Sequence, residues 1–321
     1  SRNGDRVNRH TPSGRRTLGL LLALSTALIW GALPVVLKIL VQWVDVYTLA
    51  WTRFLLAGAL LTPILVRRYG WRVLGDVRRA PLLMLVCIGG LCGNYVTYLT
   101  SLRFVSPGAA QVVMQMTPML VLLGGLVIFR ETFTRTQWLG LGLLVFGIGL
   151  FLHHRYDGLL TGLDAYTGGV LLLVLSAVLW AAYILSQKQL QAYLPPEAVL
   201  LFVYAAGVVL MFPLGQPSCL ADLNRTQLGL LGLASVMTVT SYVCFGTAMN
   251  HLEASRTGVV VALTPLMTMG NAALLARIFP DLLSPEGLTV LGWVGVAMVV
   301  AGSMLGALGG RRGREEAVSA A

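Results

Sequence analysis

Long apolar runs follow one another along almost the whole chain, and this feature limits the fold more than any other. Ten of them approach the roughly 20 residues that a helix needs to cross a bilayer core of about 30 Å. They lie at 17–40, 47–66, 80–102, 108–129, 136–154, 166–190, 196–215, 227–250, 256–279 and 287–308. Only 11% of the 321 residues are charged, against about 25% in soluble domains. We therefore predict an all-α integral membrane protein with ten transmembrane helices.

The basic residues predict which way these helices point. With the N-terminus in the cytoplasm, 17 of the 23 Lys and Arg residues fall on the cytoplasmic side and five on the outer side. The positive-inside rule then predicts that both termini are cytoplasmic. Anionic lipid head groups account for the net charge of +10, so we expect the lipid bilayer and no nucleic acid as a partner.

The chain contains an internal repeat. Residues 27–38, ALIWGALPVVLK, return as AVLWAAYILSQK at 177–188, an offset of 150. Thr-Pro-Met-Leu at 117–120 returns as Thr-Pro-Leu-Met at 264–267, an offset of 147. Each copy holds five spans, an odd number, so the second copy enters the membrane from the opposite side. The pattern predicts two inverted five-helix repeats, the architecture of transporters that open a central site alternately to either side.

Four segments follow from this division. We expect a basic tail at 1–16, a first repeat at 17–154, a second, inverted repeat at 166–308 and a second tail at 309–321. Ten spans with an internal repeat can form a pathway without a partner chain. We therefore expect a monomer that carries a small-molecule substrate.

The repeated segments, in this order, resemble the EamA-type branch of the drug/metabolite transporter superfamily. The resemblance covers all ten spans. It rests on LIWGALPVVLK (28–38), WTRFLLAGALL (51–61), the stretch from SLRFVSPG to GLFL (101–152) and MNHLEASRTGVVVALTPLM (249–267). The family pattern has an acidic residue after the fourth span, here Glu131. No glutamate stands at the matching place in the second half, which puts the role of that acid in doubt.

Within the superfamily the chain resembles the bacterial aromatic amino acid exporters in particular. The resemblance implies efflux of Phe, Tyr, Trp and other apolar amino acids across the inner membrane, with no cofactor. Export of another metabolite or of an amphiphilic drug with the same fold stays open as the alternative.

Polar and aromatic residues on helical faces are candidates for the lining of a central cavity. An aromatic amino acid needs ring contacts, donors for its carboxylate and acceptors for its ammonium group. Packing between helices is the alternative role of each candidate. The candidates are Trp30, Asn94, Tyr95, Tyr98, Gln111, Gln115, Trp180, Tyr183, Gln187, Ser241, Tyr242, Phe245, Thr264 and Asn271.

Charges inside the spans are scarce. All thirteen acidic residues fall in tails, loops or span ends, so a proton relay on a buried carboxylate has no residue, and we expect transport down the gradient. Arg53 is the one charge inside a span, either a contact for a substrate carboxylate or a structural residue. Lys38 and Lys188 are expected to reach the membrane surface as markers of the helix ends.

Three prolines are candidate hinges. Pro34, Pro118 and Pro265 each remove a backbone hydrogen bond inside a span, and a static kink is the alternative. Other classes of protein have less support. The spans carry no HExxH, paired aspartates or Ser-His pair, which disfavours an intramembrane enzyme. The four cysteines include no CxxC pair, so we expect no metal site.

Overall fold

The computed structural model describes residues 15–70, 80–129, 134–153, 164–252, 254–281, 283 and 287–319. Every regular element in those ranges is helical, and ten stretches of helix are long and apolar enough to span a membrane. This confirms the predicted all-α fold with ten transmembrane helices. Glu131 and most of the basic tail at 1–16 lie outside the described residues.

The helices of the two halves follow the same order. The first half contains α1 (Arg16–Leu40), α2 (Val46–Tyr69), α3 (Pro81–Ser101), α4 (Pro107–Met114), α5 (Met116–Phe129) and α6 (Arg135–Leu152). The second half contains α8 (Ala165–Leu190), α9 (Pro196–Met211), η3 (Phe212–Leu214), η4 (Pro217–Asp222), α10 (Arg225–His251), α11 (Ala254–Val261), α12 (Thr264–Leu275) and α13 (Val290–Ser319). Most ends lie within three residues of the prediction, but α13 continues to Ser319, beyond the expected 308.

Short polar side chains and prolines explain where several helices begin. The side chains of Asp45, Ser106 and Asp164 each accept a hydrogen bond from the backbone N–H three residues further on. Thr134 and Asn224 do the same within complete capping boxes. A helix start leaves backbone N–H groups without intrahelical partners, and such caps satisfy them. These residues therefore separate the apolar runs into individual helices.

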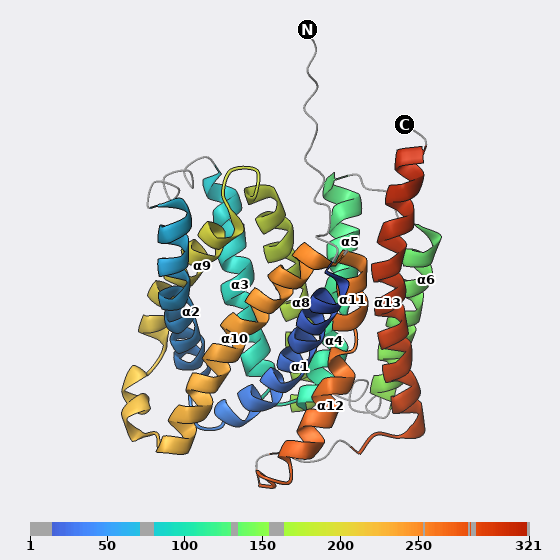
Figure 1. Ribbon diagram of the computed structural model, residues 1–321. Coiled ribbons are helices and arrows are strands. Elements are labelled where there is room, and N and C mark those ends of the chain that lie inside the picture. The colour runs from blue at the N-terminus through green and yellow to red at the C-terminus, as the bar shows by residue number, and fades with distance from the viewer. Residues whose placement is uncertain are drawn as a thin grey trace.

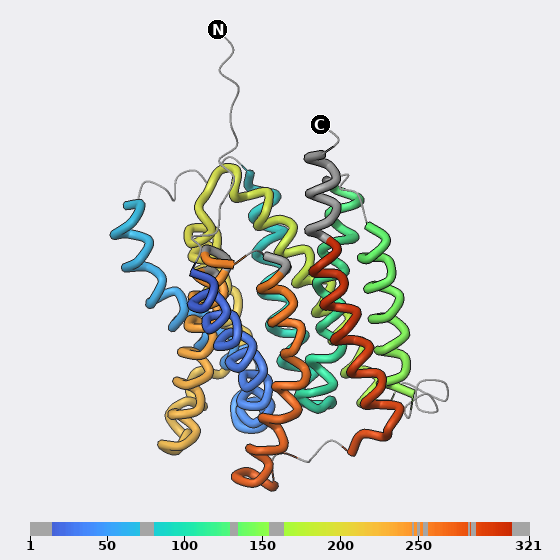
Figure 2. Tube along the Cα trace, turned by 45° about the vertical axis from the view of Figure 1, so that its right-hand side comes forward, coloured from blue at the N-terminus to red at the C-terminus, as the bar shows by residue number. Residues whose placement is uncertain are grey.

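The helices pair as an inverted repeat requires. The fifth span of one half packs against the fifth of the other (α6 with α13), and the second against the second (α2 with α9). The first span of each half packs against the third of the other, which gives α1 with α10 and α3 with α8. Figures 1 and 2 both show α6 and α13 side by side at one edge of the bundle. Helices at equivalent places thus meet across a common axis.

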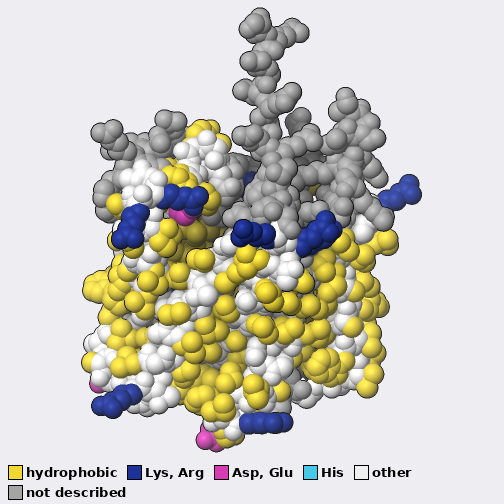
Figure 3. All heavy atoms as spheres, in the orientation of Figure 1, with side chains coloured by type: hydrophobic (Ala, Val, Ile, Leu, Met, Phe, Trp, Pro, Cys, Tyr) yellow, Lys and Arg dark blue, Asp and Glu magenta, His cyan; other side chains and the backbone are white. Residues whose placement is uncertain are grey.

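Two ends of the bundle are distinguished below. The end where α1 begins and α13 ends, uppermost in Figure 1, is named the terminal face, and the other end the opposite face. In the view of Figure 3, hydrophobic side chains cover the middle of the molecule, and the Lys and Arg side chains gather near its two ends. This apolar belt matches the hydrocarbon layer of a membrane.

Glycines allow α6 and α13 to touch through their backbones. A Cβ atom on Gly140 would lie 2.7 Å from the Gly302 carbonyl oxygen and 2.9 Å from the Gly306 nitrogen. A Cβ on Gly147 would lie 2.8 Å from the Gly295 carbonyl oxygen. Small residues at such contacts are the usual means of close helix packing in membranes. This pair therefore forms a rigid scaffold at the edge of the bundle.

We predict that Gly140→Leu destabilises the protein by about 1–3 kcal/mol, because the added side chain forces the two backbones apart. Gly142→Leu is the matched control on the same helix, since a Cβ on Gly142 meets nothing within 4 Å. The measurement is thermal unfolding of both purified variants in detergent. Equal melting temperatures for the two variants would contradict the proposed role of this contact.

Candidate functional site

Two spans are interrupted near the middle of the bundle. The fourth span breaks at Gln115, between α4 and α5, and the ninth at Ala262 and Leu263, between α11 and α12. Pro118 and Pro265 lie within the first three residues of the helices that follow the breaks. Backbone N–H groups at a helix start have no intrahelical partner, so proline is tolerated there. Both prolines therefore lie in the first turn of a new helix, whereas Pro34 lies buried inside the continuous helix α1.

Gln115 joins the two breaks. Its Nε2 donates a hydrogen bond to the carbonyl oxygen of Ala262 at 3.1 Å, and its Oε1 accepts one from Ser303 Oγ of α13 at 3.0 Å. Ala262 is the residue 147 positions after Gln115, the offset between the Thr-Pro motifs. Gln115 of the first repeat therefore hydrogen-bonds to Ala262, the residue at the equivalent position of the second repeat.

The two breaks differ in how their backbone is satisfied. Pro265 has no N–H to donate to the Val261 carbonyl, and the Thr264 hydroxyl donates to that carbonyl instead. The equivalent hydroxyl, Thr117 Oγ1, is buried and has no hydrogen-bond partner among the described residues. The break in the first repeat thus retains an unused polar group near the centre of the protein.

Arg53 lies buried between α2, α3 and α10. Its Nε and Nη2 donate hydrogen bonds to Thr238 Oγ1 at 3.3 and 2.9 Å. The guanidinium carbon lies 4.5 Å from the ring centroid of Tyr95, a cation–π contact. Only 5% of the residue is exposed.

Aromatic rings form two sets of contacts, one of which includes Tyr95 and so adjoins Arg53. Phe54 contacts Tyr95 with ring centroids 4.5 Å apart and Tyr204 at 5.8 Å. Trp30 contacts Tyr242 at 6.0 Å and Phe245 at 5.3 Å. These rings come from α1, α2, α3, α9 and α10, so both repeats contribute. We name the group of Trp30, Phe54, Tyr95, Tyr204, Tyr242 and Phe245 the aromatic cluster.

The sequence identified part of this cluster. Trp30, Tyr95, Tyr242 and Phe245 were expected to line the site, and the structure places each of them in ring contacts. Phe54 and Tyr204 were missed, although they stand 150 residues apart, the offset between the Trp-Lys segments. Thr238 was also missed, because a single threonine on a long apolar helix carries no signal until its neighbour is known.

Several other candidates make hydrogen bonds between or within helices. Asn94 Nδ2 donates to Ser176 Oγ of α8 at 2.7 Å, and Gln111 Nε2 donates to the Trp30 carbonyl oxygen at 3.3 Å. Ser241 Oγ donates to the Thr238 carbonyl oxygen within α10. These contacts hold the helices that carry the aromatic cluster.

The remaining candidates do not form one group. Trp180 contacts Tyr183 on α8, with centroids 6.3 Å apart, and Gln187 lies one turn further along. Asn271 is half-buried on α12. Tyr98 is half-buried on α3, and its hydroxyl oxygen is sealed from solvent without a hydrogen-bond partner among the described residues.

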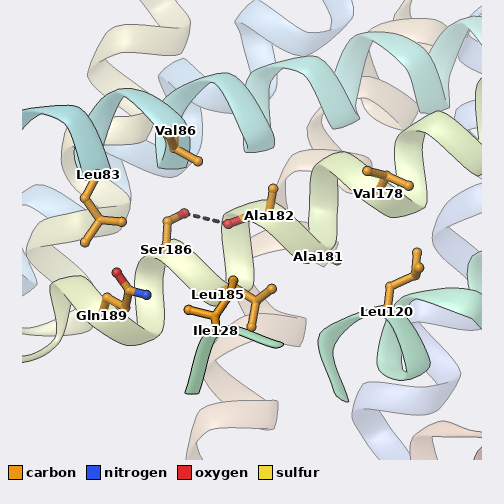
Figure 4. Close-up of a pocket in the computed structure, with 10 residues that line it drawn as sticks. All are labelled: Leu83, Val86, Leu120, Ile128, Val178, Ala181, Ala182, Leu185, Ser186 and Gln189. Carbon is orange, nitrogen blue, oxygen red and sulfur yellow. Dashed lines mark hydrogen bonds between the residues drawn. The ribbon is translucent and has the colours of Figure 1, made fainter. Parts of the chain in front are cut away.

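A groove opens between α3, α5 and α8 in the half of the bundle near the terminal face. Its volume is about 340 Å³, and its lining is almost wholly apolar. Figure 4 shows the lining side chains, including Leu83 of α3, Ile128 of α5, and Leu185 and Gln189 of α8. Ile128 remains 52% exposed.

The equivalent place near the opposite face is filled. With the offset of 147, Leu83 and Ile128 are equivalent to Leu230 and Leu275. With the offset of 150, Leu185 and Gln189 are equivalent to Val35 and Ile39. The side chains of these four equivalents belong to one packed cluster between α10, α12 and α1, in which Val35 and Ile39 are 0% exposed. The two halves of the bundle thus differ in packing at matching positions.

Lys38 does not reach freely to the surface as expected. Its Nζ donates hydrogen bonds to the backbone carbonyl oxygens of Leu102 and of Val105, the latter at 3.1 Å. These carbonyls lie where α3 ends, and a lysine there satisfies groups that the helix leaves unpaired. Its counterpart Lys188 is exposed near the terminal face. Lys38 therefore fastens α1 to the loop between α3 and α4 at the opposite face.

Comparison with known proteins decides the family. The model of the EamA-like transporter family matches residues 17–152 and again 167–307. The chain belongs to this family. It is a transporter rather than an enzyme, and the family model matches twice, as the internal repeat predicts.

Relatives of this EamA-like transporter extend over nearly its whole length. It is 33% identical to an uncharacterized inner membrane transporter of Escherichia coli strain K12, YhbE, over 92% of each chain. An uncharacterized transporter of Haemophilus influenzae is 31% identical, over 91% of this chain and 95% of that one. A probable amino-acid metabolite efflux pump of Salmonella typhimurium is 25% identical, over 93% and 97%. With its ten apolar helices, the protein is a multi-pass protein of the bacterial inner membrane.

A solved crystal structure supports the fold of this EamA-like transporter independently. That chain is 21% identical in sequence and superposes with a TM-score of 0.61. The match covers 92% of this chain and 99% of the other. At this identity the likeness concerns the fold alone.

We predict that Gln115→Leu lowers the stability of this transporter by about 1–3 kcal/mol, because the Ala262 carbonyl and the Ser303 hydroxyl lose their partner inside the bundle. Gln111→Leu is the control, since it removes one longer hydrogen bond from a half-buried side chain. Thermal unfolding in detergent measures both. A smaller loss for Gln115→Leu than for Gln111→Leu would contradict the central role of Gln115.

Proposed function

We propose that this transporter exports aromatic and other apolar amino acids, which pass between the two repeats at the aromatic cluster. The cluster carries this proposal, because rings from both repeats are in contact there. Tyr and Trp rings offer apolar faces together with hydrogen-bonding groups, which suits an aromatic amino acid. The relative from Salmonella typhimurium, named a probable amino-acid metabolite efflux pump, supports the same class of cargo.

Of the residues expected to line the site, we assign contact with cargo to two groups. The first is Trp30, Tyr95, Tyr242 and Phe245 in the aromatic cluster, with Tyr98 on the same face of α3 as Tyr95. The second is the Trp180, Tyr183 and Gln187 series on α8. Asn94, Gln111, Gln115, Ser241 and Thr264 hold the helices in place through the hydrogen bonds described above.

We propose that the terminal face is cytoplasmic. The distribution of basic residues, with 17 of 23 on that side, supports this orientation. The groove between α3, α5 and α8 then lies in the cytoplasmic half, and the filled cluster of Val35 and Ile39 lies in the outer half. The Lys38 contacts add to the closure of the outer half. The described conformation is thus more tightly packed at the outer side than at the cytoplasmic side.

Alternating access follows from this difference in packing. In an inverted repeat, each half can adopt the conformation of the other, and the exchange moves the opening to the other side. Closing the groove around Leu185 and Ile128, while opening the cluster around Val35 and Leu275, accomplishes this exchange. The helices that move in this exchange are α5 and α12. Pro118 and Pro265 lie in their first turns, and we propose that the two prolines act as hinges for this motion.

We also propose that transport runs down the gradient of the amino acid through a monomer. No carboxylate lies in the middle of a span, and the usual proton-coupled antiporter depends on such a group. The two halves of one chain supply both sides of the pathway. A second chain is therefore not required.

Flux into proteoliposomes tests the cargo. We predict uptake of labelled Phe, Tyr and Trp, unchanged in extent by an imposed pH gradient. Trp30→Ala should lower the flux at low substrate concentration by about tenfold, because the substrate loses a ring contact. Trp293→Ala is the control, since Trp293 lies 50% exposed on α13, outside the cluster. Transport of another metabolite without Phe, Tyr or Trp would contradict the proposal, and uphill accumulation driven by protons would contradict the down-gradient mechanism.

Cysteine labelling tests the difference between the two halves. In a background without the four native cysteines, we predict that Leu185→Cys reacts with a polar thiol reagent at least tenfold faster than Val35→Cys in the absence of substrate. The two positions are equivalent in the repeats, so a structure with two identically packed halves would give equal labelling rates. Equal rates would show that the two halves are equally open and would contradict the proposed conformation.

A further inference from the structure

Arg53 uses only part of its hydrogen-bonding capacity. A guanidinium has five N–H donors, and the hydrogen bonds of Arg53 occupy Nε and Nη2, both on the single oxygen Thr238 Oγ1. Within the described part of the chain, Nη1 has no acceptor. The Thr238 hydroxyl already gives its own proton to the Ala234 carbonyl oxygen at 2.8 Å, so it remains a neutral partner.

Among the described side chains, no carboxylate pairs with Arg53. The carboxylates whose side chains are described are those of Asp45, Asp164, Glu197, Asp222 and Asp281, all of which lie at helix ends or in loops. Glu197 is engaged by Arg68, with Nη1 and Oε1 3.0 Å apart. A buried cation without a counter-charge is strongly disfavoured, and a cation–π contact offsets only part of that cost. The position therefore favours an anion supplied from outside the protein.

The Tyr98 hydroxyl is a second unused donor. It is buried and has no hydrogen-bond partner among the described residues. Tyr98 follows Tyr95, whose ring Arg53 contacts, by three residues on α3, so both side chains lie on one face of that helix. Buried polar groups normally have a partner, so an unused hydroxyl on the helix face that Arg53 contacts needs an explanation. A guanidinium nitrogen and a hydroxyl can each donate to one oxygen of a carboxylate.

Resting on the transport path proposed above, we propose that Arg53 and Tyr98 form a binding site for the carboxylate of the cargo. The aromatic cluster then receives its apolar body. The cargo is then a monocarboxylate that carries an aromatic or large apolar group. This class includes zwitterionic amino acids and excludes amines and neutral amphiphiles. No covalent step takes place.

The site is single, although the fold is repeated. Phe54 and Tyr204 are equivalent residues, and the position equivalent to Arg53 is Val203. The carboxylate therefore has one place to bind, on the side of α2 and α3. Since the two repeats supply unequal partners, the cargo takes one orientation in the path.

Matched pairs of acids and amides test the site. Binding of 3-phenylpropionate, 3-phenylpropionamide, L-phenylalanine and L-phenylalanine amide to the full chain in nanodiscs is measured by tryptophan fluorescence. We expect each acid to bind at least tenfold more tightly than its amide. Arg53→Gln should reduce this ratio to about one through a ten- to hundredfold loss of acid affinity. The affinity for the amides should stay within about threefold.

Three further variants separate binding from structure. Arg68→Gln removes the same charge from the same helix at an exposed position and should keep the ratio. Thr238→Val removes the hydroxyl that accepts from Arg53 and should also leave the ratio of acid to amide affinity unchanged. Tyr98→Phe removes a hydroxyl with no described partner, so the fold is unaffected, and should lower the ratio three- to tenfold.

The possible results are distinct. Equal binding of acids and amides by the unmodified protein, or an unchanged ratio in Arg53→Gln and Tyr98→Phe, would overturn the carboxylate site. If 3-phenylpropionate binding depends on Arg53 and L-phenylalanine does not bind, the carboxylate site stands and the amino acid function fails. If L-phenylalanine is bound and transported without dependence on Arg53, the function stands and the site fails.

Discussion

Two broken helices must satisfy their backbones in the middle of a membrane, and the rest of the structure depends on how they do so. Unpaired backbone groups are strongly disfavoured in lipid, so irregular backbone occurs only where protein surrounds it. Here the breaks lie against each other, and Gln115 donates to the carbonyl of its own equivalent, Ala262. Ser303 of α13 extends this link to the rigid α6–α13 pair. Gln115 thus satisfies a backbone carbonyl of the second break and joins the two repeats at one point.

The same arrangement allows the two halves to differ. A contact on the pseudo-symmetry axis can persist while packing changes on both sides of it. Near the opposite face, Val35 and Ile39 are sealed against α12, and Lys38 caps the carbonyls at the end of α3. Near the terminal face, the equivalent residues Leu185 and Gln189 line an open groove. The two repeats are therefore packed differently at matching residues, which is the asymmetry that the proposed alternating access requires.

Periodic patterns could be predicted from the sequence, and individual partners could not. The ten spans and the repeat follow from hydropathy and from offsets of 147 and 150, since lipid leaves a helix few alternatives. The mid-span prolines were candidate hinges or static kinks, and the structure shows a helix break within three residues before Pro118 and Pro265 but none before Pro34. Lys38 was expected at the surface because a span that ends in lysine usually reaches the head groups. Its true partners are carbonyls 64 and 67 residues away, a contact that no local pattern encodes.

The scarcity of charge gives Arg53 its significance. In a soluble protein a lone arginine pairs with water or with one of many carboxylates, but the spans of this chain hold no acid at mid-depth. The aromatic cluster lowers the cost of the charge through Tyr95 without neutralising it. In the carboxylate site proposed above, an anion that reaches Arg53 is attracted by a charge that no mid-span carboxylate neutralises. The proposed site therefore needs no buried carboxylate and no change of protonation to attract its cargo.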